Sequence, residues 1–136
     1  SGERVGRDGC RVPLPWEANS PAFGFSETGK SWLPQPENYR SYSRDQQDGV
    51  AGSTLELYKR LLKVRKEFAL GDGSVEWNED LCTDSTLAYK NGSVLVVANF
   101  GPDSLTLPAG EVLATTQHDL SAEGMLEHDQ VAWIKL

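Results

Sequence analysis

The apolar positions follow a helical period in only one part of the chain, between residues 53 and 70. The stripe has six members: Leu57, Tyr58, Leu61, Leu62, Val64 and Phe68. Their three- and four-residue spacing places them on one face of a helix. Ser53 is a suitable N-cap, and Glu56 three residues later completes a capping box. The pattern predicts one amphipathic helix over residues 53–70, with a solvated basic face opposite the stripe.

Beyond residue 73 the apolar residues occur in short runs separated by turn residues. Asn91-Gly92 is a strong hairpin signal, and it lies between expected strands at 86–90 and 93–100. Residues 94–98 are continuously hydrophobic, which is typical of a strand buried on both faces. Further short strands are expected at 104–107, 112–115 and 131–136. The pattern predicts a small antiparallel β-sandwich over residues 73–136.

Residues 1–50 show neither period, and five prolines interrupt them. Six aromatic side chains are nevertheless spread along this part: Trp16, Phe23, Phe25, Trp32, Tyr39 and Tyr42. Disordered segments are poor in aromatics, so we expect a long ordered loop packed on some surface. Such a loop and a lone amphipathic helix both need a larger partner. We therefore expect the chain to be part of a larger protein.

Charge and composition exclude several function classes. The net charge is -7, from 13 basic and 20 acidic residues, so a nucleic-acid backbone would be repelled. The sequence has no apolar run long enough to span a membrane. Cys10 and Cys82 are far apart and belong to no metal-binding spacing, so we expect no metal site. Two isolated thiols favour a reduced, cytoplasmic compartment.

A resemblance to a known family rests on motifs in a fixed order. Residues 7–16 read RDGCRVPLPW, residues 22–26 AFGFS, and residues 53–66 STLELYKRLLKVRK, and Val94–Phe100 ends in Asn-Phe. Together they resemble the R-D-x-x-R-T-P-M-Q-W stretch and later elements of α-glucosidases in glycoside hydrolase family thirteen, the α-amylase superfamily. The stretch is most similar to enzymes of high-GC Gram-positive bacteria. Val12 in place of Thr, and Leu-Pro in place of Met-Gln, depart from the family pattern.

The resemblance implies a fold class. Residues 1–50 would be the loop after the eighth strand of a (β/α)8 barrel, and residues 53–70 the eighth barrel helix. Residues 73–136 would be the C-terminal domain. The fold class implied for this chain is therefore mainly β. It would consist of an antiparallel sandwich preceded by one helix and a long ordered loop. Because active sites of such barrels lie in the loops after the strands, the aromatic loop would belong at a sugar pocket.

The resemblance also implies a function for the whole protein, the retaining hydrolysis of terminal α-linked glucose from an oligosaccharide, with no cofactor. Retaining enzymes use two carboxylates about 5–5.5 Å apart. The family motifs that carry them are missing from this chain, so we predict no catalytic residue in it and no activity of the chain alone. Two alternatives remain open: a trehalose synthase or related glucosyl-transferring isomerase, and a stand-alone carbohydrate-binding β module. The leading loop and helix argue against the module.

Substrate-binding candidates come from the same resemblance. By the family pattern Arg7 would reach the pocket floor, pair with an upstream Asp and hold glucose hydroxyls, a task that suits a planar, permanently charged guanidinium. Arg11 is the second candidate, although a role in tying the loop is favoured for it. Trp16 and Phe25 would either stack on sugar or be buried anchors, and we expect anchors. In isolation, the helix over 53–70 would pack on the β domain or pair with a second copy.

Overall fold

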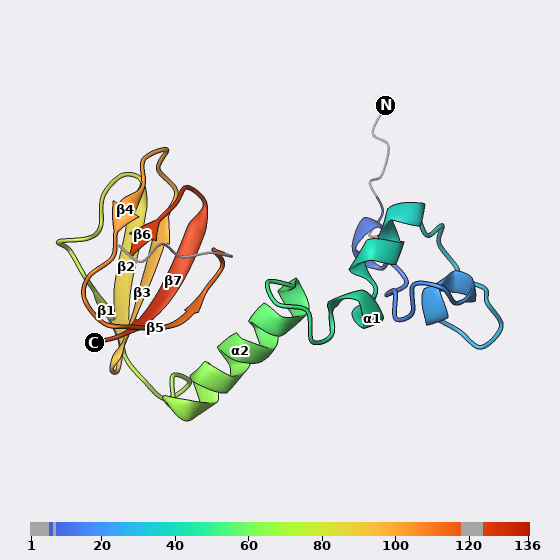
Figure 1. The fold of residues 1–136 in the computed structure, drawn as a ribbon, viewed down its shortest axis with the longest axis horizontal. Helices are drawn as coiled ribbons and strands as arrows, with labels where there is room; N and C mark the ends of the chain where they lie inside the picture. Colours follow the sequence, from blue (N-terminus) through green and yellow to red (C-terminus); the bar gives the residue numbers. More distant parts are fainter. Residues whose placement is uncertain (1–5, 7, 118–123) are drawn as a thin grey trace. The chain divides into compact units, whose positions relative to one another are not determined.

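The computed structural model of the chain describes residue 6, residues 8–117 and residues 124–136. The chain divides into two compact units, Ser1–Glu56 and Leu57–Leu136. The described part of the first unit contains short helical turns without a strand, whereas the second unit contains the β-strands (Figure 1).

The first unit is an ordered chain of short turns. Three are 3-10 turns and one is a single α-helical turn: η1 Asp8–Cys10, η2 Pro21–Gly24, η3 Glu37–Tyr42 and α1 Arg44–Gln47. Proline deprives the backbone of an N–H donor, so a sequence with this many prolines cannot continue a longer helix. Long-range hydrogen bonds replace the missing regular structure.

The predicted amphipathic helix is confirmed as α2, Thr54–Glu67. The Ser53 hydroxyl accepts the N–H of Glu56 at 3.2 Å, which is the N-cap interaction. The other half of the predicted capping box is not formed. The Glu56 carboxylate accepts the N–H of Gly49 at 2.9 Å, and the N–H of Ser53 goes to the carbonyl of Val50. The helix start is thus tied to the preceding turn.

Only part of the predicted stripe of α2 is buried. Val64 is 1% exposed and forms a cluster with Val94 and Leu113 of the sheet. Tyr58 and Leu62 are each 62% exposed. The basic face is not entirely solvated either, because the Arg60 guanidinium donates to the carbonyl of Leu113 at 2.7 Å.

The second unit is built on a five-stranded antiparallel sheet of order β1-β2-β3-β7-β5, and a separate two-stranded sheet pairs β4 with β6. The bounds are β1 Val75–Trp77, β2 Thr86–Asn91, β3 Val94–Asn99, β4 Leu105–Thr106, β5 Glu111–Thr115, β6 Met125–Leu126 and β7 Gln130–Lys135. Sequence analysis missed β1 and β6. The central β3 is buried along its whole length, as its continuous hydrophobic run predicts.

The hairpin predicted at Asn91-Gly92 joins β2 to β3, with a loop one residue later than expected. Asn91 pairs with Val94, so the two loop residues are Gly92 and Ser93. Gly92 has a φ of 60° at the first loop position, where type II′ hairpins place a glycine.

The main apolar core lies on one face of the five-stranded sheet. Leu95, Val97 and Ile134 of that sheet pack with Leu107 and Leu126, which belong to the β4–β6 region. The predicted sandwich is not confirmed, since the second sheet has two short strands. The structure shows a mainly antiparallel β unit with few helices.

The Asn-Phe pair that carried part of the resemblance has a structural explanation. Asn99 is 1% exposed, and its side-chain NH₂ group donates to the carbonyls of Asp103, Leu126 and Glu127 at 2.9–3.2 Å. Its side-chain oxygen accepts the N–H of Gly101 at 3.0 Å. One buried amide thus satisfies both backbone segments that follow β3 and β6. An apolar residue could not replace it there.

Candidate functional site

Of the two arginines expected to bind substrate, only Arg11 lies among the described residues. Arg7 lies outside the described residues. Arg11 is exposed, and its carbonyl oxygen accepts the indole N–H of Trp32 at 3.1 Å. Among the described residues its guanidinium has no partner. The backbone of Arg11 therefore ties the loop to Trp32.

The segment around Phe23 gives the loop a fixed shape. The carbonyl of Phe23 accepts two N–H groups, from Trp16 at 2.8 Å and from Glu17 at 3.1 Å. Ala22 and Phe23 both have a φ of 49°, and Gly24 follows with a φ of 70°. Left-handed conformations of residues other than glycine cost about 1–3 kcal/mol each and are held only by surrounding contacts. A Cβ at position 24 would lie 3.2 Å from that of Glu17.

A second set of contacts ties this segment to η3 and α1. Both carboxylate oxygens of Asp45 accept the N–H of Ala18 at 3.1 Å. The Arg40 guanidinium donates to the Ala18 carbonyl, and to the Asn19 side chain at 2.9 Å. It also lies 5.7 Å from the centre of the Phe23 ring. Residues about twenty positions apart are thus joined by polar side chains.

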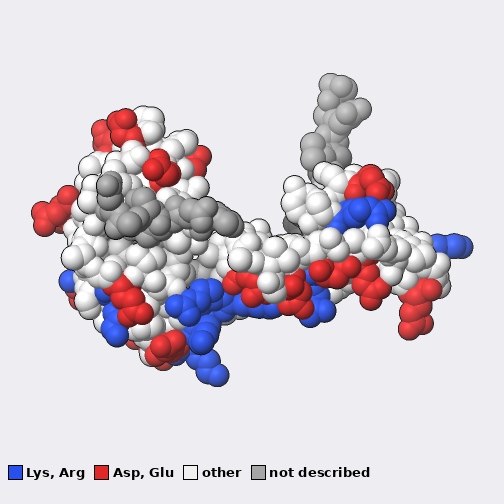
Figure 2. Space-filling model, in the orientation of Figure 1, with Lys and Arg blue, Asp and Glu red and all other residues white. Residues whose placement is uncertain are grey.

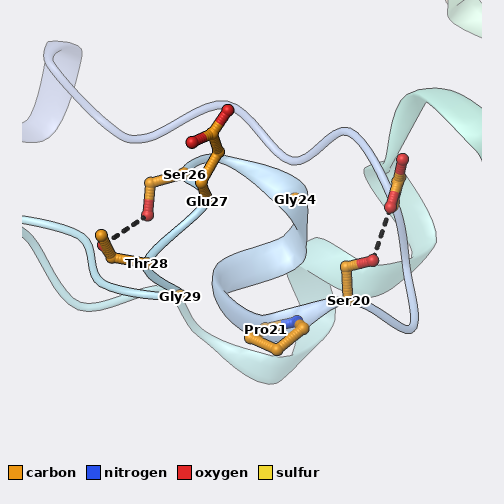
Figure 3. A pocket seen from close by; sticks show the side chains of 8 residues that line it. Ser20, Pro21, Gly24, Ser26, Glu27, Thr28 and Gly29 are labelled. Atoms are coloured by element: carbon orange, nitrogen blue, oxygen red, sulfur yellow. Dashed lines mark hydrogen bonds between the residues drawn. The ribbon is translucent and has the colours of Figure 1, made fainter.

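The same segment contains a hollow of about 370 Å³ within residues 17–29, and its lining includes hydroxyls and carboxylates. Figure 3 shows Ser26 and Thr28 pointing toward each other on one side, with Ser20 and Pro21 on the other. The Ser20 hydroxyl donates to the Glu17 carboxylate, and the hydroxyls of Ser26 and Thr28 are 3.2 Å apart. A hollow lined by hydroxyls and carboxylates suits a polar ligand.

A second hollow of about 300 Å³ in the same unit has a more apolar lining. It is formed by Leu14, Pro15, Trp16, Tyr42, Arg44, Gln47 and Leu55. Leu14, Trp16 and Tyr42 expose 58%, 48% and 63% of their surface. The Arg44 guanidinium forms an ion pair with Asp48 at 2.7 Å. Aromatic faces beside an arginine and an amide are the groups with which proteins contact sugar rings.

The expectation that Trp16 is a buried anchor is therefore wrong, whereas Phe25 is half-buried and meets Trp32 edge-on at 4.9 Å. Tyr42 and Arg44 were missed as lining residues of the second hollow. Their positions in the sequence give no periodic signal, because a loop brings them beside Leu14 through long-range contacts. Only the aromatic content of the segment could have indicated them.

The described residues include many charged side chains, which could form metal-binding groups or clusters of one sign. No group of three His, Cys, Asp or Glu side chains there is arranged to hold a metal ion. Basic side chains gather along α2, while acidic ones are scattered over both units (Figure 2). No described helix has the length and apolar character needed to cross a membrane.

The first half of the chain matches a known protein family. The family described as alpha amylase, catalytic domain, matches residues 1–73. A salivary alpha-glucosidase of Aedes aegypti is 35% identical over 104 residues, which are 74% of this chain and 18% of that protein. Similar proteins come from insects and yeasts as well as bacteria, so the narrower resemblance to high-GC Gram-positive bacteria is not supported.

Solved structures cover nearly the whole chain. An isomaltulose synthase from a Klebsiella species is 27% identical with a TM-score of 0.75, over 96% of this chain and 26% of that one. A trehalose-6-phosphate hydrolase of Bacillus licheniformis is 27% identical with a TM-score of 0.72, over 96% and 27%. The chain spans about a quarter or less of the length of these proteins. It belongs to the alpha-amylase family, and alpha-glucosidases are among its relatives.

Proposed function

We propose that this chain is the C-terminal part of a retaining α-glucosidase that hydrolyses terminal α-linked glucose of oligosaccharides. The observation that carries the proposal is the family match over residues 1–73, together with relatives named alpha-glucosidase. In this proposal residues 1–50 form the loop after the eighth barrel strand, and residues 53–70 form the last barrel helix. Residues 73–136 are the C-terminal β domain.

The chain itself would bind substrate without cleaving it. Two hollows in the first unit offer hydroxyl, aromatic and guanidinium groups to a sugar. Arg7 and Arg11 are the proposed substrate-binding residues, with Arg7 favoured. The catalytic carboxylates would come from the rest of the protein, and hydrolysis would need no cofactor.

The exposed Tyr58 and Leu62 of α2 fit the same proposal. In the whole protein this surface would face other barrel elements, whereas the isolated chain would use it for self-association. A cytoplasmic location is also proposed, because two cysteines far apart in the sequence fit a reduced compartment.

The test compares two proteins, the 136-residue chain and the longest natural protein that contains it. Each is incubated with maltose, and the products and their anomeric form are followed by NMR. We expect α-glucose from the longer protein and no turnover by the chain. Turnover by the chain alone, or a natural reading frame without barrel strands ahead of residue 1, would overturn the proposal.

Arginine variants of the longer protein test the site. Arg7→Ala should lower kcat/KM by about a hundredfold, equivalent to about 2.7 kcal/mol, because a buried carboxylate would lose its partner. Arg11→Ala should have a smaller effect, and Lys30→Ala serves as an exposed control. Equal effects of Arg7→Ala and Lys30→Ala would contradict the role of Arg7.

A second candidate is a glucosyl-transferring isomerase related to trehalose synthase. The likeness to an isomaltulose synthase structure at 27% identity favours it. The same maltose incubation separates the candidates, since an isomerase would yield a rearranged disaccharide such as trehalose, and a hydrolase would yield glucose alone.

A further inference from the structure

An aromatic side chain stands at the edge of the five-stranded sheet, far in sequence from the hollows of the first unit. Trp77 is the last residue of the edge strand β1 and is 62% exposed. An exposed indole offers a large, rigid, amphipathic ring for contact with a ligand.

The ring of Trp77 is supported from one side. Trp77 pairs with Tyr89 across β1 and β2, and the two rings meet edge to face with centroids 5.9 Å apart and an interplanar angle of 73°. Tyr89 is half-buried. An edge-to-face neighbour limits the motion of the indole, so its flat face is presented in a fixed orientation.

Polar groups surround this ring. A hollow of about 410 Å³ is lined by Glu76, Trp77, Asn78, Glu79, Asp80 and Lys90. Glu76 and Lys90 are cross-strand neighbours, yet they form no ion pair with each other or with any other described residue. The Asn78 side-chain oxygen accepts the N–H of Leu81 at 3.3 Å, which leaves the NH₂ group to donate to a ligand.

From this arrangement we propose a surface oligosaccharide-binding site on the β unit, with Trp77 as the stacking platform. A sugar ring has an apolar face of C–H groups and a rim of hydroxyls. The indole would cover the first, and the carboxylates, amide and ammonium around it would bind the second. That the ligand is an α-linked glucose chain rests on the proposed function, whereas the platform does not.

A protein partner fits this place less well. An added strand would have to pair with β1, which has only three residues. Glu76, Glu79 and Asp80 would bring several negative charges into such an interface, and charged side chains on an edge discourage strand addition. A neutral ligand with many hydroxyls has no such conflict.

The test uses the 136-residue chain labelled with ¹⁵N and titrated with maltotriose. The chain has four Trp residues, so the indole N–H signals can be followed one by one and that of Trp77 identified by its loss in Trp77→Ala. We expect the Trp77 signal to shift. Trp77→Ala should weaken binding at the β unit, seen in the amide signals of Asn78 and Lys90, by at least about tenfold, or about 1.4 kcal/mol.

Phe100→Ala is the matched control, because Phe100 is 59% exposed in the same unit and does not line the hollow. Trp77→Phe, which keeps a smaller flat ring, should bind with intermediate affinity. An unmoved Trp77 signal, or equal binding by Trp77→Ala and Phe100→Ala, would overturn the proposal.

The outcomes of this titration distinguish the proposed function from the proposed surface site. A shift confined to Trp16 would report the partial pocket of the proposed α-glucosidase and would overturn the Trp77 platform. A Trp77 shift in a chain whose longer natural protein does not act on maltose would retain the platform and reject the proposed function.

Discussion

In the unit Ser1–Glu56, backbone and side-chain hydrogen bonds join short turns, whereas Leu57–Leu136 is built on a strand ladder around an apolar core. Among the described residues, the buried apolar side chains of the first unit are Pro13, Ala18 and Phe23, and the other buried hydrophobic side chains belong to the second. The first unit instead relies on contacts such as those of Arg40 and Asp45 with Ala18.

The two units therefore depend on different interactions and should respond differently to substitutions. An apolar core tolerates surface changes but not the loss of volume, while a polar frame depends on individual hydrogen bonds. The irregular unit also carries the two hollows lined by hydroxyl, carboxylate, aromatic and guanidinium groups. Loops placed by specific contacts commonly carry function, and regular elements commonly carry stability.

The largest expected effect comes from the core of the second unit. Leu95 is 1% exposed, and Leu95→Ala should lower the free energy of unfolding of that unit by about 2–5 kcal/mol. Leu136→Ala, at a leucine of the same unit that is 50% exposed, should change it by no more than about 0.5 kcal/mol. Urea unfolding with amide exchange measures both. Similar losses in the two variants would show that the apolar core does not dominate this unit.

A polar residue inside the same unit should have the next largest effect. Asn99→Ala would leave three carbonyls and the N–H of Gly101 without the amide, and we expect a loss of about 2–3 kcal/mol. Asn38→Ala, at an exposed asparagine of the first unit, should have almost no effect. Urea unfolding of both variants measures the difference. A neutral Asn99→Ala would mean that water replaces the buried amide and would weaken the contrast between the units.

The smallest expected effect is local to the first unit. Arg40→Ala removes the contacts to Ala18, Asn19 and Glu37, and should cost about 1 kcal/mol because the side chain is half exposed. Amide exchange of Ala18 should quicken about fivefold, with β3 unchanged. Lys30→Ala is the control. If exchange in β3 quickened equally, the two units would not be independent in stability.

The sequence by itself determined the elements whose cause is local. The i, i+4 repeat and Ser53 specified α2, and the turn chemistry of Gly92 specified the β2–β3 hairpin. The hydrophobic run of β3 indicated burial on both faces. In each case the signal and the structure it predicts lie within about fifteen residues, so no distant part of the chain was needed to decide them.

The sequence failed where the deciding contact is distant. The strands β1 and β6 have two or three residues each and exist through pairing with β2 and β4. Trp16 was expected to be buried, but the side chain is 48% exposed. Short strands and irregular loops carry too few side chains for a period to appear.

The tertiary structure alone decided which side chains are buried and which are exposed to solvent. The α2 stripe looks uniform in sequence, yet Val64 is buried and Leu62 is exposed, because only the sheet surface around Val94 and Leu113 lies against the helix. The placement of Trp77 on Tyr89 likewise follows from the pairing of β1 with β2. Local periodicity fixes which residues share a face. The packing of elements distant in sequence fixes whether that face meets protein or solvent.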